Sequence, residues 1–336
     1  MRQTAFMILA AIMFCLITTI GRLEAKELIF TQGYNAIEVI DTDSDESVAY
    51  IPIDGFTREI VWTEDKKTLY VTTKRHNIVK IDLQQLKVVK TFDASRDGWK
   101  RNIWGFVLSS DSKTAYINSI DRKVEGGDVL VRQTISQIDL EDGRVLRSMT
   151  PPWGVAGLVY QKDGKTLFAV GLDIYKIDIA HNEMRIVDTY PMFDKKKNIL
   201  PIWHSTQENG GIFMSNYYTP EYMGLLSINA NTGEIVDRQI KGPPVMAYSF
   251  IYSADKKKAY GIMEDVTVID LETNSVIKSF PNGEGTSYSV IPTGDGKKLY
   301  VGAGGSTITV YDAESLNVLK VLQMQADSVA LNKISF

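Results

Sequence analysis

The chain has 336 residues, of which 44% are hydrophobic and 23% are charged, and its formal net charge is −4. These values are ordinary for a globular protein. The mildly negative charge argues against a nucleic-acid-binding protein, for which a basic patch is expected.

Residues 1–25 predict a signal peptide. Arg2 precedes sixteen mostly apolar residues, AFMILAAIMFCLITTI (5–20), and Ala25 supplies a small residue at the expected cleavage point. An uncleaved membrane anchor is the alternative, although the apolar run is short for crossing a bilayer. Cleavage would remove Cys15, the only cysteine, so the exported chain would have no thiol for a disulfide, a thiolate metal site or a haem attachment.

Residues 26–336 contain seven copies of one strand-rich unit. In each copy an alternating strand ends in Asp or Asn, and an Asp side chain there can open a turn by accepting backbone N–H groups two residues on. The seven positions are Asp41, Asp82, Asp139, Asp178, Asn229, Asp270 and Asp312. The residue four positions later is Gly or Asn in four copies, which favours a positive φ: Gly143, Asn182, Gly233 and Asn274.

The first copy lacks a strand that the others have. It begins abruptly at ELIFTQG (27–33), whereas an extra strand-like stretch, DSVALNKISF (327–336), follows the last copy. We therefore predict one all-β domain over 26–336, a seven-bladed β-propeller with four-stranded blades, whose C-terminal strand completes the first blade and closes the ring. A strand-rich solenoid is the alternative.

Longer connections fall on one predicted face, at 93–102, 119–133, 189–198 and 216–223. Loops on a rigid scaffold often carry function, and Trp and Tyr are favoured at protein interfaces. The candidate partner-binding aromatic residues are Trp99, Trp104, Trp153, Tyr217, Tyr218 and Tyr222. Trp104 and Trp153 have the alternative of packing between blades. The three tyrosines are expected to be exposed, in an inserted loop.

Recognisable catalytic apparatus is absent from the sequence. The three histidines fall in different repeats, and there is no phosphate loop, nucleophile elbow or dinucleotide fingerprint. His204, in PIWHSTQENG, is expected to face the central channel as a hydrogen-bonded or channel-lining residue, with a catalytic or ligand role as the alternative; it is also a candidate partner contact. The sequence predicts no catalytic, cofactor-binding or metal-binding residue in this chain.

The amino-acid sequence of the repeats resembles the YVTN class of propeller units. Within that class, the chain resembles the β subunit of quinohemoprotein amine dehydrogenases over nearly its whole exported length. The most specific stretches are ILPIWHSTQENGGIFMSNYYT (199–219), GLLSINANTGEI (224–235) and SYSVIPTGDGKKLYVGAGGSTITVYDAESL (287–316).

The resemblance implies a subunit of a periplasmic heterotrimer. In that family a dihaem α subunit carries two c-type haems and a small γ subunit carries a cysteine tryptophylquinone, while the β propeller binds no redox cofactor and holds the γ subunit. The complex oxidises primary amines to aldehydes and ammonia and passes electrons to a periplasmic carrier. The resemblance implies no membrane contact after signal cleavage. It also makes Tyr217, Tyr218 and Tyr222 candidates for docking the γ subunit.

Two alternatives remain open at this point. The heavy chain of methylamine dehydrogenase is also a seven-bladed scaffold, although it is longer and supports a different quinone subunit. A stand-alone periplasmic propeller, acting as a ligand-binding protein or a lactonase-like enzyme, is a second hypothesis of another class.

Overall fold

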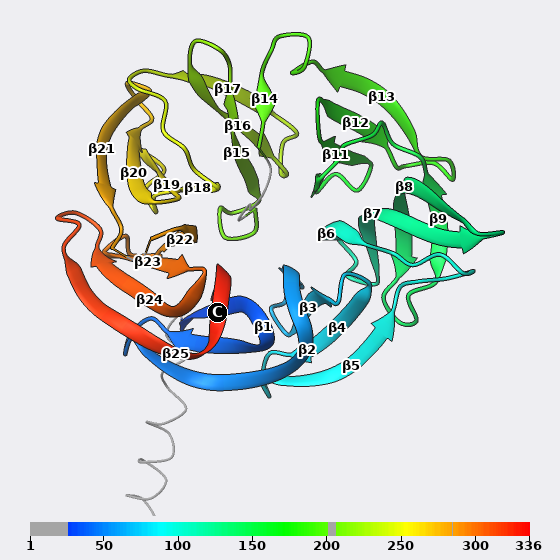
Figure 1. Ribbon diagram of the computed structural model, residues 1–336, viewed down its shortest axis with the longest axis horizontal. Coiled ribbons are helices and arrows are strands. Elements are labelled where there is room, and N and C mark those ends of the chain that lie inside the picture. Colours follow the sequence, from blue (N-terminus) through cyan, green and yellow to red (C-terminus); the bar gives the residue numbers. More distant parts are fainter. Residues whose placement is uncertain (1–25, 201–205, 284) are drawn as a thin grey trace, which may run out of the picture.

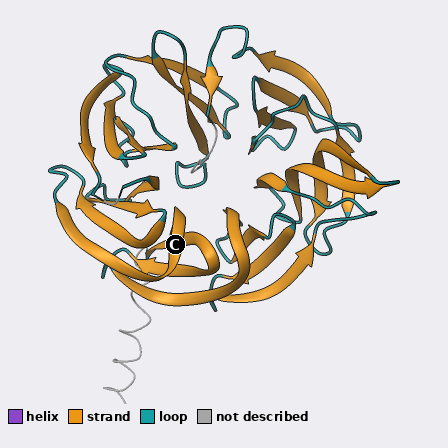
Figure 2. Cartoon of the chain, in the orientation of Figure 1, coloured by secondary structure: helices purple, strands orange, loops and turns teal. Residues whose placement is uncertain are grey.

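The computed structural model describes residues 26–200, 206–283 and 285–336, which form strands and turns without a helix (Figure 2). The expected signal peptide, 1–25, lies outside the described residues. Within the described ranges there is no helix of the length and apolar character needed to cross a membrane. The all-β part of the prediction is confirmed.

Four sheets contain four strands each, in chain order. The first sheet consists of β6 (Ile103–Leu108), β7 (Thr114–Glu125), β8 (Asp128–Asp139) and β9 (Val145–Met149). The second consists of β10 (Gly157–Tyr160), β11 (Thr166–Val170), β12 (Ile174–Asp178) and β13 (Arg185–Tyr190). The third consists of β14 (Asn198–Ile199), β15 (Ile212–Tyr218), β16 (Met223–Asn229) and β17 (Ile235–Ile240). The fourth consists of β18 (Ser249–Tyr252), β19 (Lys258–Ile262), β20 (Asp265–Asp270) and β21 (Ser275–Pro281).

The fifth sheet has nine strands in the order β22-β23-β24-β25-β1-β2-β3-β4-β5. They are β22 (Ser287–Pro292), β23 (Lys298–Ala303), β24 (Gly305–Asp312), β25 (Val318–Ser335), β1 (Glu27–Asp41), β2 (Glu46–Trp62), β3 (Thr68–Thr73), β4 (Asn77–Asp82) and β5 (Lys87–Asp93). Together the five sheets are arranged around a ring, with β6, β18 and β22 toward the centre and β5, β13 and β21 toward the rim (Figure 1). The architecture is therefore propeller-like.

Three long strands make the fifth sheet continuous. The part of β25 up to Gln323 pairs mainly with β24, and Ser328–Ser335 pairs with Glu27–Gly33 of β1. The rest of β1 pairs with the first part of β2, and Thr57–Trp62 of β2 pairs with β3. The predicted pairing of the C-terminal segment with ELIFTQG is thus observed.

The turns after the alternating strands follow one rule. Each of the seven Asp or Asn side chains accepts the backbone N–H two residues on, at 2.7–3.2 Å. The residue four positions on has a positive φ in six of the seven turns: Asp45, Leu86, Gly143, Gly233, Asn274 and Leu316. Asn182 is the exception, so its predicted positive φ is wrong.

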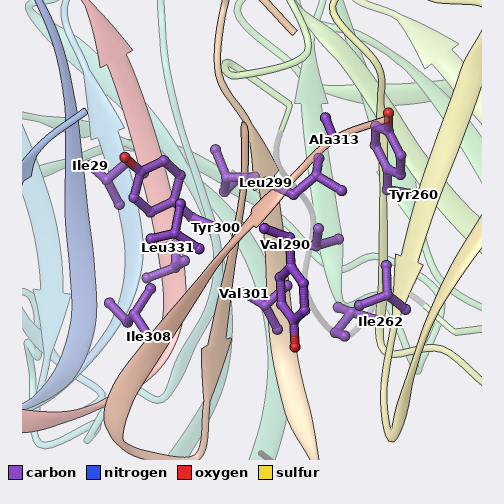
Figure 3. Close-up of a cluster of buried hydrophobic side chains, with 14 of the residues drawn as sticks. Ile29, Tyr260, Ile262, Val290, Leu299, Tyr300, Val301, Ile308, Ala313 and Leu331 are labelled. Atoms are coloured by element: carbon purple, nitrogen blue, oxygen red, sulfur yellow. The ribbon is translucent and has the colours of Figure 1, made fainter. Parts of the chain in front are cut away.

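The core lies between adjacent sheets, because alternate side chains of each strand point to opposite faces. One cluster packs the fourth sheet against the nine-stranded sheet. It contains Ile262 of β19, Val301 of β23 and Leu331 of β25 (Figure 3). Each fully buried aliphatic side chain of this kind stabilises the fold by about 1.5–3 kcal/mol. The ring is therefore a rigid frame on which the connections between strands are displayed.

Candidate functional site

Tyr217 lies in the core and not on an exposed loop. It is the penultimate residue of β15, its side chain is 0% exposed, and its hydroxyl donates to Oδ1 of Asp237 at 2.5 Å. The expectation of an exposed Tyr217 is wrong, because much of the stretch taken for an inserted loop is strand: β15 continues to Tyr218 and pairs with β14 on one side and β16 on the other.

Asp237 is the centre of a buried polar network. Besides Tyr217, it accepts a hydrogen bond from the Tyr190 hydroxyl at 3.1 Å, and it forms an ion pair with Lys197. Burial acts to raise the pKa of Asp237, but the bonds from Lys197 and Tyr217 hold it below its usual value. Burial and the neighbouring carboxylate raise the pKa of Tyr217. This network stabilises the sheet β14–β17 and leaves Tyr217 no surface for a partner.

The other two tyrosines are half-buried in the same sheet. The Tyr218 hydroxyl donates to the Val245 carbonyl at 3.0 Å and accepts the Ala247 N–H at 3.3 Å. The Tyr222 ring packs edge-on against Tyr217, with 6.2 Å between ring centroids. The three predicted tyrosines are therefore close together, but they serve mainly internal contacts.

Trp99 and Trp104 are each covered by an arginine. The Arg132 guanidinium lies 3.9 Å from the centroid of the Trp99 ring, and that of Arg58 lies 4.3 Å from the Trp104 ring. Trp104 is the second residue of β6, and its buried indole N–H has no partner among the described residues. For Trp104 the structure favours the alternative of packing within the ring.

Trp153 is mostly exposed. It stands in the connection between β9 and β10 with 60% of its surface exposed, and Phe193, between β13 and β14, is 64% exposed. Beside Trp153, a cavity of about 580 Å³ is lined by Gly154, Leu172, Phe193 and Lys196, among others. His204 lies outside the described residues. Trp153 is therefore an exposed aromatic residue, as is Phe193, which the sequence analysis does not single out.

The hairpin β7–β8 is a second exposed apolar feature that was missed in the sequence. The two strands pair continuously as far as Glu125 and Asp128, and Val124 near the tip is 72% exposed. Val129, Leu130 and Val131 on the returning strand are also exposed. The prediction of a loop at 119–133 is wrong, and the apolar run VLV after the glycine pair 126–127 is typical of a hairpin.

A cavity of about 150 Å³ lies among the inner strands, and we call it the central cavity. Its lining includes Arg58 and Glu59 of β2, Phe106 of β6, Val159 of β10 and Glu208 of the segment before β15. In that segment the Gln207 side chain accepts the Trp62 N–H and donates to the Trp62 carbonyl, both at 2.9 Å. These two bonds tie the segment carrying Glu208 to β2, across the inner side of the ring.

Both glutamates of the central cavity are strongly perturbed. Burial raises the pKa of Glu59 to about 7, against the opposing effect of Arg58, whose Nε lies 3.6 Å from its carboxylate. Burial raises the pKa of Glu208 to about 8. The negative charge of Glu59 also raises this pKa, whereas the positive charge of Lys333 lowers it. Carboxyls perturbed by burial in a cavity are candidates for a functional site.

Sequence reasoning missed these glutamates. The local sequences, TREIVW (57–62) and STQENGG (205–211), do not mark either glutamate as part of a buried site. Among the described residues no group of three or more His, Cys, Asp or Glu side chains is placed to hold a metal ion. The central cavity offers the two perturbed carboxyls of Glu59 and Glu208 and buried amides instead.

Comparison with known proteins gives the fold. No family model and no curated protein matches the chain. Its structure is similar to that of hydrazine synthase from Kuenenia stuttgartiensis, with a TM-score of 0.56, 17% identity, and coverage of 87% of this chain and 90% of that chain. It is similar to the dihydro-heme d1 dehydrogenase NirN, with a TM-score of 0.58, 14% identity, and coverage of 92% and 76%.

A third similar structure is the β-propeller domain of Swd1 from Myceliophteria thermophila, with a TM-score of 0.56, 13% identity, and coverage of 82% of this chain and 88% of that chain. At such identities a structural likeness shows the fold alone. The chain is a β-propeller protein.

Proposed function

We propose that this chain is the non-redox β subunit of a periplasmic quinohemoprotein amine dehydrogenase. Its role there is to hold the small quinone-bearing γ subunit and the dihaem α subunit in the assembly that oxidises primary amines to aldehydes and ammonia. The observation that carries the proposal is the sequence resemblance to that β subunit at 199–219, 224–235 and 287–316, found in a chain that folds as a propeller.

The proposal includes a ring of seven four-stranded blades over 26–336. The nine-stranded sheet divides into three of them at its long strands, β25 and β2. The middle blade is formed by Ser328–Ser335 of β25, both parts of β1 and the first part of β2. With the four separate sheets, this division gives seven blades and a ring closed by the C-terminal strand.

In this proposal the chain itself binds no cofactor and carries no catalytic residue. The cysteine tryptophylquinone belongs to the γ subunit and the two c-type haems belong to the α subunit, while electrons leave to a periplasmic acceptor. The only cysteine of the sequence is Cys15, inside the expected signal peptide, so residues 26–336 offer no thiol for covalent haem attachment. The complex acts in the periplasm, away from membrane and nucleic acid.

The partner surface of the proposal is the edge of the ring that carries Trp153, Phe193 and the β7–β8 hairpin. Trp153 and Phe193 are large, aromatic and more than half exposed, which is typical of anchors that fill pockets of a partner. The hairpin adds the exposed Val124 and Leu130. Trp99 lies beside the same hairpin, since Arg132 of β8 covers its ring.

Purification of an affinity-tagged chain from the periplasm of its own cells tests the proposal. We expect a haem-staining chain and a small quinone-staining chain to co-purify, and amine-dependent dye reduction by the complex. The double variant Trp153→Ala/Phe193→Ala should lose partners, whereas Val321→Ala, an exposed residue on β25, should retain them. A chain recovered alone, without either partner, contradicts the proposal.

A stand-alone ligand-binding propeller is the second candidate function. One observation favours it: the central cavity holds Glu59 and Glu208, whose pKa values are raised to about 7 and 8. A scaffold subunit does not need such carboxyls. A purified chain that is monomeric and active without partner chains would support this candidate over the first.

A further inference from the structure

We propose that the central cavity binds one small organic cation, a primary alkylammonium ion of about four or five carbons. The site is built by Glu59 and Glu208 at the charged end of the ligand and by apolar side chains of the inner strands along its hydrocarbon part. This inference is independent of the amine dehydrogenase proposal, because it concerns the isolated chain.

The charges of the lining leave room for one cation. Among the described residues, the lining contains three acids, Glu59, Glu64 and Glu208, and two bases, Arg58 and Lys162. Lys162 pairs with Glu64 at 3.1 Å, and Arg58 lies beside Glu59. Glu208 is the acid left over, and its Oε1 is buried without a hydrogen-bond partner among the described residues.

A buried amide supplies a second, independent sign of a ligand. Gln32 lines the cavity and is 5% exposed, and its Oε1 has no partner among the described residues. Buried polar atoms are almost always hydrogen-bonded in folded proteins, so this unpaired acceptor facing the cavity marks a place for a donor. An ammonium group can donate to both Gln32 Oε1 and Glu208 Oε1.

The rest of the lining favours an organic cation over a metal ion. Phe106, Leu108 and Val159 contribute apolar surface from β6 and β10. A Ca²⁺ or Mg²⁺ ion would prefer six or more oxygen ligands and would gain nothing from these side chains. The volume of about 150 Å³ is close to that of a cavity able to hold a benzene-sized molecule, which has about six non-hydrogen atoms.

Binding of a cation should release protons. Glu59 and Glu208 are partly protonated near neutral pH, because their pKa values are raised to about 7 and 8. A bound ammonium ion favours the ionised carboxylates and so lowers both values. The other charged groups that act on the pair are Arg58 of β2 and Lys333 of β25. The remaining charged groups of the lining, Glu64 and Lys162, pair with each other. Affinity should therefore rise between pH 6 and pH 9.

Isothermal titration of the purified protein with n-butylammonium chloride tests the site. We expect saturable binding at one site, at least tenfold tighter at pH 9 than at pH 6, with proton release seen as a heat that depends on the buffer. n-Butanol, the neutral molecule of the same size, should bind at least tenfold more weakly. This pair of titrations needs no variant.

Variants then assign the charge. Glu208→Gln should weaken butylammonium binding at least tenfold at pH 8, whereas Glu141→Gln, which changes an exposed acid paired with Lys90, should not. Circular dichroism verifies that each variant is folded, and Glu59→Gln replaces Glu208→Gln if the latter is not. Equal binding of butanol, binding of Ca²⁺ but not of butylammonium, or no saturable heat overturns the inference.

Discussion

Truncation of Leu331 to alanine tests the most specific packing contact of the C-terminal strand. Leu331 is 1% exposed and belongs to the cluster that includes Ile29 and Val301. The contact is tight, since a Cβ atom built on Gly302 would lie 3.0 Å from the Leu331 Cγ. The backbone also leaves little room to collapse, because Leu331 pairs with Thr31 in the ladder. We expect the free energy of unfolding to fall by about 2–5 kcal/mol, as for other buried leucines.

Leu319→Ala is the matched control, because it makes the same truncation on the same strand. Leu319 lies in the part of β25 before Gln323 and is 54% exposed, so its loss should change the free energy of unfolding by about 0.5 kcal/mol or less. Urea unfolding, followed by far-ultraviolet circular dichroism and by tryptophan fluorescence, measures both midpoints. Equal midpoints for the two variants would refute the packing of 328–335 against β1 and β23.

Three further predictions concern other parts of the ring. Tyr217→Phe should cost about 1–3 kcal/mol in urea unfolding, because it leaves buried Asp237 without one hydrogen bond; an unchanged midpoint would mean that Tyr217 is a surface residue after all. The folded state holds protons on Glu59 and Glu208 up to pH values of about 7 and 8, whereas both carboxyls ionise near pH 4.5 when unfolded, so stability should fall as pH rises from about 5 to 9. Glu208→Gln should flatten that fall in melting temperature, and an equally steep curve in the variant would contradict the burial of this carboxyl. Trp153→Ala should leave the melting temperature unchanged, since the side chain is 60% exposed, yet weaken recovery of partner chains; a large loss of melting temperature would mark it as a core residue.

The repeat could be predicted because its signals are local. An Asp at the end of an alternating strand and a residue of positive φ four positions later specify a turn whatever surrounds it, and such turns are observed after Asp139 and Asn229. Asn182 differs because sequence alone records only that Asn tolerates this conformation. The pairing of 27–33 with 328–335 could also be predicted, since a missing strand and a surplus strand complement each other.

The site could not be predicted in the same way. Whether Tyr217 is buried depends on the length of β14, only two residues in the structure, and on Asp237 in a strand twenty residues away. Glu59 and Glu208 become neighbours only when the inner segments of different sheets are brought around one centre. Their separation in the sequence, and their ordinary surroundings of threonine, glutamine and isoleucine, give no sign of that meeting.

The pairing of β1 with β25 also has a consequence for the order in which the protein matures. Ser335 and Glu27 touch through a hydrogen bond of 3.0 Å although 308 residues separate them, and the Phe336 N–H donates to the Lys26 carbonyl at 2.9 Å. A chain that emerges from a ribosome or a translocation channel amino end first must keep the edge of Glu27–Gly33 unpaired until the very last segment appears. Molecules interrupted before residue 328 would therefore carry an open strand edge, which makes them natural targets for chaperones and proteases. Because residues 26 and 336 lie together, a short peptide linking them should allow circular permutation, with new termini at another hairpin. A different strand would then be synthesised last.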